Sequence, residues 1–299
     1  MHKERDTIIH TACLVLAAFF WGTTFVAQSI GADYVGAYTY LASRSWIAVV
    51  VLFPIMKILN KKGSETQADS KYSTVKYKAL GGAICGLFLF IASGFQQIGM
   101  AYTTTAKAGF ITALYVVLVP VLYLFLGGKV SPKIWICVIM AVTGLYLLCI
   151  SGAVSLEFGD GIILVSAFFF ALQIIAVNRF VDKINPIELS WIQFLFTAVL
   201  STIVMFLFEE VTISNMISAF PAILYAGIFS SCIAYTLQIV GQRGLNPTIA
   251  SIAMSLESVF SAISGWIVLG EGMSLRECIG AAIMFAAIII SQIPVKSEK

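Results

Sequence analysis

Long apolar stretches alternate with short polar breaks along the whole chain. A helix needs about 20 apolar residues to cross the roughly 30 Å hydrocarbon core of a bilayer, and ten stretches reach or approach this length. Strands of a membrane barrel would instead run for about ten residues of alternating polarity. The pattern therefore predicts ten transmembrane helices, near residues 8–28, 38–59, 79–100, 107–126, 133–150, 160–181, 187–208, 218–241, 247–269 and 275–293.

The breaks between these stretches carry turn chemistry or charge. Asn185-Pro186 and Asn246-Pro247 are turn-forming pairs, and Pro247 at the start of the ninth stretch favours a kink or a sharp helix start. Glu209-Glu210 marks another break. The first apolar stretch follows Lys3 and Arg5 but is longer than the apolar region of a signal peptide, so we interpret it as a retained helix.

The composition supports a membrane protein and excludes several other classes. Hydrophobic residues make up 60% of the 299 residues, charged residues only 11%, and the mean hydropathy is +0.96. Soluble globular chains carry about 25% charged residues, so a soluble enzyme, a disordered chain and a nucleic-acid-binding module are excluded. The six cysteines form no CxxC pair and are interpreted as small apolar packing residues.

The basic residues define an orientation. With the N-terminus in the cytoplasm and ten spans, 15 of the 18 Lys and Arg residues fall in cytoplasmic segments, Lys107 and Arg276 fall outside, and Arg44 lies within a span. Lys and Arg gather on the cytoplasmic side of membrane proteins. We therefore expect a multi-pass protein of the plasma membrane, that of a bacterial cell, with both termini cytoplasmic and the bilayer as its immediate partner.

The two halves of the chain show a weak internal similarity. Residues 18–21 (AFFW) correspond to residues 167–170 (AFFF) at an offset of 149, and Leu126-Gly127 corresponds to Leu269-Gly270 at an offset of 143. Because each half holds five spans, an odd number, the second half must enter the membrane the other way up. We expect two inverted five-helix repeats, residues 1–152 and 153–299, around a central cavity, a recurrent transporter design.

Several motifs now carry a family resemblance. Trp21-Gly22-Thr23-Thr24-Phe25 resembles the WGxxF signature in the first helix of EamA-type members of the drug/metabolite transporter superfamily. Residues 246–248 (NPT), followed by residues 255–260 (SLESVF), look like that family's ninth helix, although the family pattern has proline where this chain has Ser258. The resemblance implies ten helices in an inverted repeat and export of amino acids or other small metabolites.

Glu257 is the first candidate functional residue, because it lies near the middle of the ninth stretch. An ionised carboxylate there costs roughly 2.5–3.5 kcal/mol on insertion scales. It must face a wet cavity, pair with a cation or hold a proton. The functional interpretation is that Glu257 binds a substrate amine or exchanges a proton, and the alternative is a structural carboxyl hydrogen-bonded between helices.

Arg44 is the second candidate, about 9 Å below the outer end of its span at 1.5 Å per residue. It could clamp a substrate carboxylate or reach the outer interface as a structural arginine. Trp21, Tyr115 and Tyr235 are deep aromatics that could form cavity walls or ordinary packing surface. Gln193, the deepest glutamine within its span, could bind substrate or join helices, and Gln96, Gln97 and Gln238 share this alternative.

The leading functional hypothesis is a secondary transporter that exports small amphiphilic metabolites, amino acids or related compounds, by alternating access. A proton is the candidate coupling ion. The alternatives are an uncoupled facilitator or exchanger, and a non-transporting membrane receptor or scaffold. No HExxH, Walker A or GxSxG motif is present, so we expect neither an enzyme nor a self-contained ATP-driven pump, and no metal, cofactor or nucleic acid. The sequence leaves the oligomeric state open.

Overall fold

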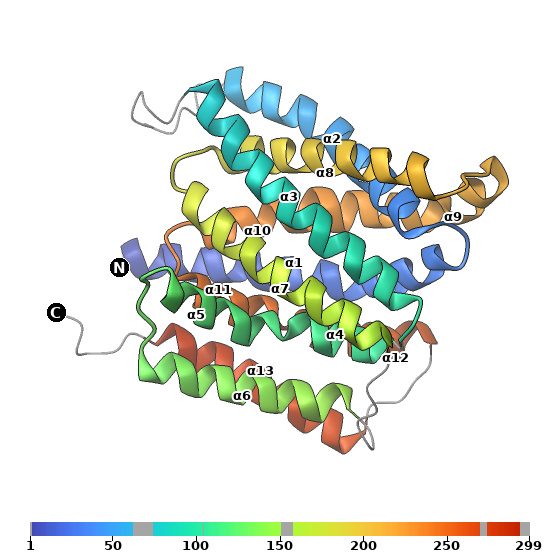
Figure 1. The fold of residues 1–299 in the computed structure, drawn as a ribbon. Helices are drawn as coiled ribbons and strands as arrows, with labels where there is room; N and C mark the ends of the chain where they lie inside the picture. Colours follow the sequence, from blue (N-terminus) through green and yellow to red (C-terminus); the bar gives the residue numbers. More distant parts are fainter. Residues whose placement is uncertain (1, 62–73, 104, 151–157, 270–273, 294–299) are drawn as a thin grey trace.

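A computed structural model describes residues 2–61, 74–103, 105–150, 158–269 and 274–293, and the regular structure of these residues is entirely helical (Figure 1). The first half forms α1 (His2–Ala32), α2 (Ala37–Lys61), α3 (Val75–Met100), α4 (Thr105–Ala113), α5 (Tyr115–Phe125) and α6 (Pro132–Cys149). The second half forms α7 (Phe158–Phe180), α8 (Pro186–Phe208), α9 (Ile213–Tyr225), the π-helix η1 (Ala226–Ala234), α10 (Tyr235–Gln242), α11 (Pro247–Met254), α12 (Glu257–Leu269) and α13 (Leu275–Gln292).

These helices combine into ten spans. Within the described residues, ten helical segments are long and apolar enough to cross a membrane, and they follow the ten predicted stretches closely. The second span, for example, is Ala37–Ile58 against the predicted 38–59. The largest shift is in the eighth span, which begins at Ile213 rather than near residue 218. The prediction of an all-helical membrane protein with ten spans is confirmed.

The fourth, eighth and ninth spans are not continuous α-helices, which the hydrophobic pattern did not predict. The fourth is divided at Leu114 into α4 and α5, and the ninth is divided at Ser255 and Leu256 into α11 and α12. The eighth consists of α9, η1 and α10 in one unbroken run. π-Helical turns are rare and occur preferentially at functional sites, so these three spans are where a site is to be sought.

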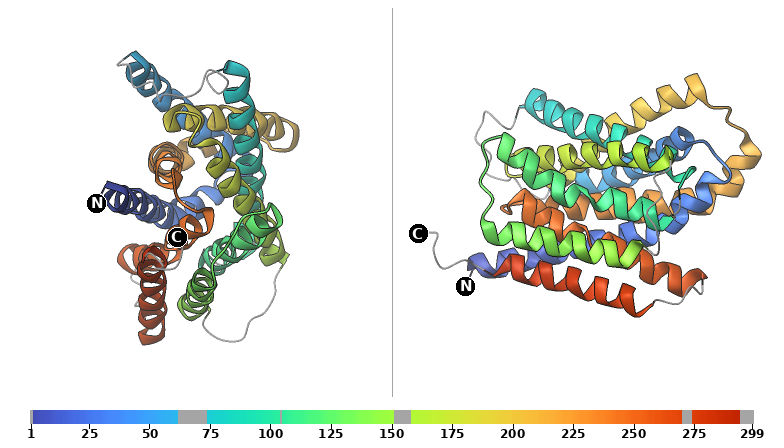
Figure 2. Two further views of the ribbon diagram at one scale, coloured as in Figure 1. Left: turned by 90° about the vertical axis from the view of Figure 1, so that its left-hand side faces the viewer. Right: turned by 60° about the horizontal axis from the view of Figure 1, so that its bottom comes forward.

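The two halves pack in the manner of an inverted repeat. The second helix of each half, α2 and α8, pack against each other, as do the last helices, α6 and α13. Figure 2 shows the spans lying side by side, with the N- and C-termini at the same end of the bundle. The fold of two five-helix repeats is thus confirmed, and the expected boundary between residues 152 and 153 lies outside the described residues.

The breaks in the sequence form helix caps. The Asn185 side chain accepts hydrogen bonds from the backbone N–H groups of Ile187 and Glu188 at the start of α8. Asn246 caps α11 in the same way, and the following prolines occupy the first helical positions of both helices. These caps satisfy N–H groups that a helix start leaves unpaired, and the seventh and ninth spans begin directly at the breaks that the Asn-Pro pairs mark.

Gly22 brings α1 and α12 into direct backbone contact. A Cβ atom at this position would lie 2.6 Å from Cβ of Phe260 and 2.7 Å from the carbonyl oxygen of Glu257. No side chain fits there, so the glycine of the WGxxF motif is required by packing. The contact holds the start of α12 against the middle of α1.

Candidate functional site

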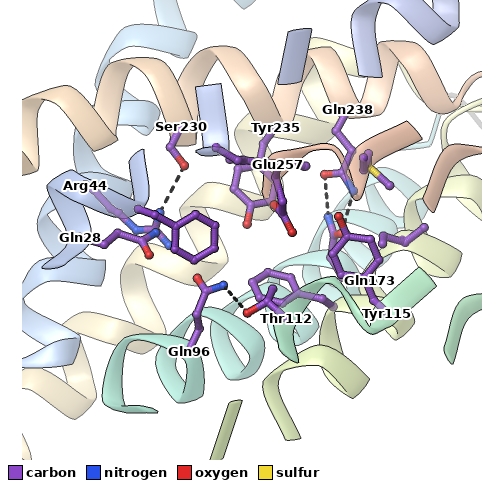
Figure 3. A pocket seen from close by; sticks show the side chains of 15 residues that line it. Gln28, Arg44, Gln96, Thr112, Tyr115, Gln173, Ser230, Tyr235, Gln238 and Glu257 are labelled. Atoms are coloured by element: carbon purple, nitrogen blue, oxygen red, sulfur yellow. Dashed lines mark hydrogen bonds between the residues drawn. The ribbon is translucent and has the colours of Figure 1, made fainter. Parts of the chain in front are cut away.

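A central cavity lies between the helices of both repeats, with about 460 Å³ of non-atom space that includes its open side. Figure 3 shows Arg44 and Gln28 at one end of the cavity, Gln173 and Gln238 at the other, and Tyr235 and Glu257 between them. The lining residues are Trp21, Phe25, Gln28, Arg44, Gln96, Thr112, Tyr115, Phe170, Gln173, Ile174, Ser230, Tyr235, Gln238, Met254 and Glu257.

Repeat symmetry organises much of this lining. Five pairs of lining residues occupy equivalent positions of the two repeats, at an offset of 149 in the first helices and 142 in the later ones. The pairs are Trp21 with Phe170, Phe25 with Ile174, Gln96 with Gln238, Thr112 with Met254, and Tyr115 with Glu257. The cavity therefore lies at the interface between the repeats, where inverted-repeat transporters bind their substrates.

Two of the lining residues begin a new helical segment after an interruption within a span. Tyr115 is the first residue of α5 and Glu257 of α12, whereas Tyr235 is the first residue of α10 in the continuous run from η1. The interruptions before Tyr115 and Glu257 occur at equivalent positions of the two repeats. Backbone hydrogen bonds continue across both interruptions, from Val117 N–H to the Leu114 carbonyl oxygen and from Ser258 N–H to the Ser255 carbonyl oxygen, so each break is a tight turn within its span.

Local hydrogen bonding explains the interruption in the ninth span. The hydroxyls of Ser251 and Ser255 donate to the carbonyl oxygens of Thr248 and Ile252, each three residues earlier. Such bonds compete with the helical ladder, and the N–H of Leu256 bonds to Ala253, also three residues back. Ser258 donates to the carbonyl oxygen of Gly109 in α4. The interruption thus forms although this chain lacks the proline of the family pattern at position 258.

Arg44 and Glu257 bring two ionisable groups into the cavity without pairing them. Arg44 is 4% exposed and donates through Nη1 to the hydroxyl of Ser230 at 3.5 Å. Glu257 is 5% exposed, and its Oε1 has no hydrogen-bond partner. Within the described ranges no salt bridge joins either group to an opposite charge. Burying unpaired charge is costly, so this part of the molecule is suited to a ligand, water or a proton.

Other polar atoms around the cavity also lack partners in the described structure. They are Trp21 Nε1, Gln28 Oε1 and Arg44 Nε, whereas the Tyr115 hydroxyl lies within interaction range of the Glu257 carboxyl group. Most buried polar groups in proteins are hydrogen-bonded, and each exception requires an explanation. Donors and acceptors of both kinds converge on one space here, which is the arrangement expected for a polar organic ligand.

Aromatic rings form the wall between the polar groups. The rings of Trp21 and Tyr235 are 4.9 Å apart at an interplanar angle of 63°, and Tyr235 makes a second edge-to-face contact with Phe194 at 5.3 Å. Tyr235 is also within electrostatic range of both Arg44 and Glu257. The aromatic wall therefore supplies apolar contact area in the same cavity as the two ionisable groups.

A hydrogen-bonded set of glutamines closes one end of the cavity. Gln238 Nε2 donates to Gln173 Oε1 at 3.0 Å, and Gln173 Nε2 donates to Gln193 Oε1 at 3.3 Å. Gln173 and Gln238 line the cavity, whereas the fully buried Gln193 lies behind them. The structure thus brings five of the six predicted residues, Trp21, Arg44, Tyr115, Tyr235 and Glu257, to one cavity and leaves Gln193 outside its lining.

Sequence reasoning missed several polar lining residues. Gln28, Thr112, Gln173 and Ser230 were not singled out, and Gln96 and Gln238 had been considered only as residues that either join helices or bind a ligand. A signal for the last pair exists in the sequence, because Gln96 and Gln238 are 142 positions apart, the same separation as Tyr115 and Glu257. Ser230 carries no such signal, since it enters the site through η1.

Comparison with known proteins agrees with this architecture. A solved crystal structure superposes with a TM-score of 0.73 at 19% sequence identity, covering 94% of this chain and 96% of the other, which shows a shared fold. An uncharacterized transporter of Archaeoglobus fulgidus is 28% identical over 279 residues, 93% of this chain and 83% of its own length. The uncharacterized transporter YoaV of Bacillus subtilis is 20% identical over 284 residues, 93% of this chain and 94% of its own.

The family comparison matches each repeat separately. The sequence model of the EamA-like transporter family matches residues 9–150 and again residues 157–292. These two matches contain all ten spans except the first residues of α1, and together they contain every residue of the cavity lining. The chain therefore belongs to the EamA-like transporter family.

Proposed function

We propose that this protein is a secondary transporter that exports small amphiphilic metabolites, amino acids among them, by alternating access. The observation that carries this proposal is the cavity between the repeats, which combines unpaired Arg44 and Glu257 with an aromatic wall. A zwitterion with an apolar side chain has complementary parts. Its carboxylate suits the guanidinium of Arg44, and its ammonium suits the carboxylate of Glu257.

The proposed location is the plasma membrane of a bacterial cell, with both termini in the cytoplasm. The proposal rests on the 15 basic residues assigned to the side that carries the termini, against two on the other side. Direction is part of the proposal: substrate binds from the cytoplasm and is released outside.

A proton is the proposed coupling ion, and Glu257 is its proposed carrier. A carboxyl group that alternates between a proton and a substrate ammonium would link the two fluxes, because both compete for one negative charge. An uncoupled exchanger needs the same cavity but no proton exchange, so the two mechanisms differ in a measurable way.

The test is transport in proteoliposomes of defined orientation, using each of the twenty protein amino acids as the labelled solute. Counterflow of at least one amino acid is expected, accelerated by an imposed pH gradient. The Glu257→Gln variant is expected to lose this acceleration. Counterflow without any response to pH in the wild type would favour the exchanger, and failure of every amino acid to move would refute the proposed substrate class. Lys78→Gln, at a partly exposed ion-pair residue on α3 outside the cavity lining, is the control.

A further inference from the structure

Gln193 is the repeat equivalent of Arg44. The two residues are 149 positions apart, as are the first residues of their helices, Ala37 and Pro186. Each is therefore the eighth residue of the second helix of its repeat. Because the repeats are inverted, the two side chains approach the membrane centre from opposite faces, and Gln193 does so from the face that carries the termini.

The two equivalent side chains have different environments in this structure. Arg44 lines the cavity, whereas Gln193 is 0% exposed and lies outside the lining. The repeats also differ in their backbone, since the eighth span contains the π-helix η1 and its equivalent, α3, is a continuous α-helix. The repeats therefore hold two different conformations of one architecture, as alternating access between inverted repeats requires.

The hydrogen bonding of Gln193 is incomplete. Its Oε1 accepts from Gln173, which itself lines the cavity, but its Nε2 has no partner among the described residues. A buried amide nitrogen without an acceptor destabilises the conformation that holds it. The Gln193 side chain therefore lies directly behind a residue of the cavity lining, and its two amide N–H donors have no acceptor among the described residues.

From this relationship we infer that Gln193 is a second ligand-binding residue, used in the conformation that opens toward the face carrying the termini. When the repeats exchange conformations, Gln193 replaces Arg44 in the cavity lining and Arg44 is withdrawn. The substrate group that Arg44 binds as an anion then meets the uncharged amide donors of Gln193. This inference rests on the alternating access of the proposed function and adds to it a named contact for the opposite state.

Cysteine labelling tests the inference without knowledge of the substrate. In a variant whose six native cysteines are replaced, and which still counterflows or remains monodisperse, Gln193→Cys and Arg44→Cys are treated with the membrane-impermeant reagent MTSET from one face at a time. Gln193→Cys is expected to react from the face that carries the termini, and Arg44→Cys from the opposite face. The matched control is Gln242→Cys, because Gln242 is equally buried and its repeat equivalent, Met100, does not line the cavity.

We expect Gln193→Cys to react about tenfold or more faster than Gln242→Cys. The reagent reaches a cysteine only in a conformation that exposes it, so the labelling rate scales with the fraction of molecules in that conformation. Equal rates for the two variants, or labelling of Gln193→Cys only from the face that labels Arg44→Cys, would overturn the inference.

Transport kinetics give a second test, which needs no chemical labelling. Gln193→Met is expected to raise KM about 3- to 10-fold for an amino acid supplied at the face carrying the termini, the effect of losing one hydrogen bond, with a smaller change at the other face. Gln242→Met should leave both KM values unchanged. If the wild type moves amino acids and Gln193→Met alters neither KM, the inference fails while the proposed function stands. If the wild type moves none, the labelling result decides the inference alone.

Discussion

Arg44 and Glu257 line the same cavity, and in the described part of the chain no salt bridge joins them. Arg44 reaches the cavity from α2 in the first repeat, and Glu257 from the start of α12 in the second. Tyr235 is within electrostatic range of both. The ligand-free protein therefore keeps two opposite ionisable groups near each other without allowing them to neutralise one another, which leaves both available to a substrate.

Replacing Arg44 by methionine should stabilise the ligand-free protein and abolish binding. An unpaired buried charge is destabilising, and an apolar side chain of similar length relieves that cost. We expect the free energy of unfolding to rise by about 1–3 kcal/mol, measured by thermal unfolding in detergent, while amino-acid counterflow is lost. Lys78→Met, which removes a partly exposed ion pair with Glu188, should change stability by less than about 1 kcal/mol. A large loss of stability in Arg44→Met would show that Arg44 has a structural role instead.

Trp21→Phe should weaken substrate binding without affecting the fold. Phenylalanine keeps an aromatic ring beside Tyr235 but removes the indole N–H, which has no partner in this structure. Loss of one ligand hydrogen bond predicts a KM raised roughly 3- to 10-fold, with an unchanged melting temperature. Trp266→Phe is the matched control, because Trp266 is exposed on α12, away from the cavity. Equal KM values for the two variants would exclude a ligand contact by the Trp21 indole.

The number and position of the spans could be predicted because a helix that crosses the bilayer needs an apolar stretch as long as the hydrocarbon core is thick. The interruptions could not, since Ser251 and Ser255 are compatible with either a continuous helix or a broken one. Only their choice of carbonyl partner, visible in the structure, decides between the two. The proline of the fourth span, Pro120, lies inside α5, six residues after the interruption at Leu114.

The ionisable residues of the site could be predicted because a charged side chain inside the bilayer costs free energy. Such residues are therefore rare, and those that occur mark candidate functional positions. Uncharged polar residues give a weaker signal: Gln173 and Gln193 lie in similar apolar helices, yet only Gln173 lines the cavity. Both helices belong to the second repeat, so the difference arises from how α7 and α8 pack within the bundle. A comparison of the two repeats position by position would have found Gln96 with Gln238, but the repeats share too few identities to fix that register from sequence.

Gly22→Ala should separate α1 from α12. The added methyl group would lie 2.6 Å from Cβ of Phe260 and 2.7 Å from the backbone N of Ser261, and the helix backbone cannot yield as a flexible side chain would. We expect a loss of about 1–3 kcal/mol in the free energy of unfolding and reduced transport, because α12 carries Glu257 on its first turn. Gly161→Ala, where nothing lies within 4 Å of the new Cβ, is the control. Equal melting temperatures for the two variants would contradict the close contact.

Glu209 provides the N-terminal cap of α2 from the end of α8. Its carboxylate oxygens accept from the backbone N–H groups of Tyr38 and Thr39 at 2.8 and 2.7 Å, and also from the Thr39 hydroxyl at 2.6 Å. The approach is so close that a Cβ atom on Gly36 would lie 2.3 Å from the carboxyl group. One side chain of the second repeat thus satisfies the first donors of a helix in the first repeat.

Glu209→Ala should therefore destabilise the protein by about 0.5–2 kcal/mol, the usual loss when a cap is removed. The effect should be visible as faster amide hydrogen exchange at Tyr38 and Thr39 and as a lower melting temperature. Glu210→Ala removes an equal charge from the exposed neighbouring residue and should leave both unchanged. If the two variants lower stability equally, the effect comes from net charge at this end of the bundle. A loss confined to Glu209→Ala would identify the cap as a tether between α2 and α8, the helices that carry Arg44 and Gln193.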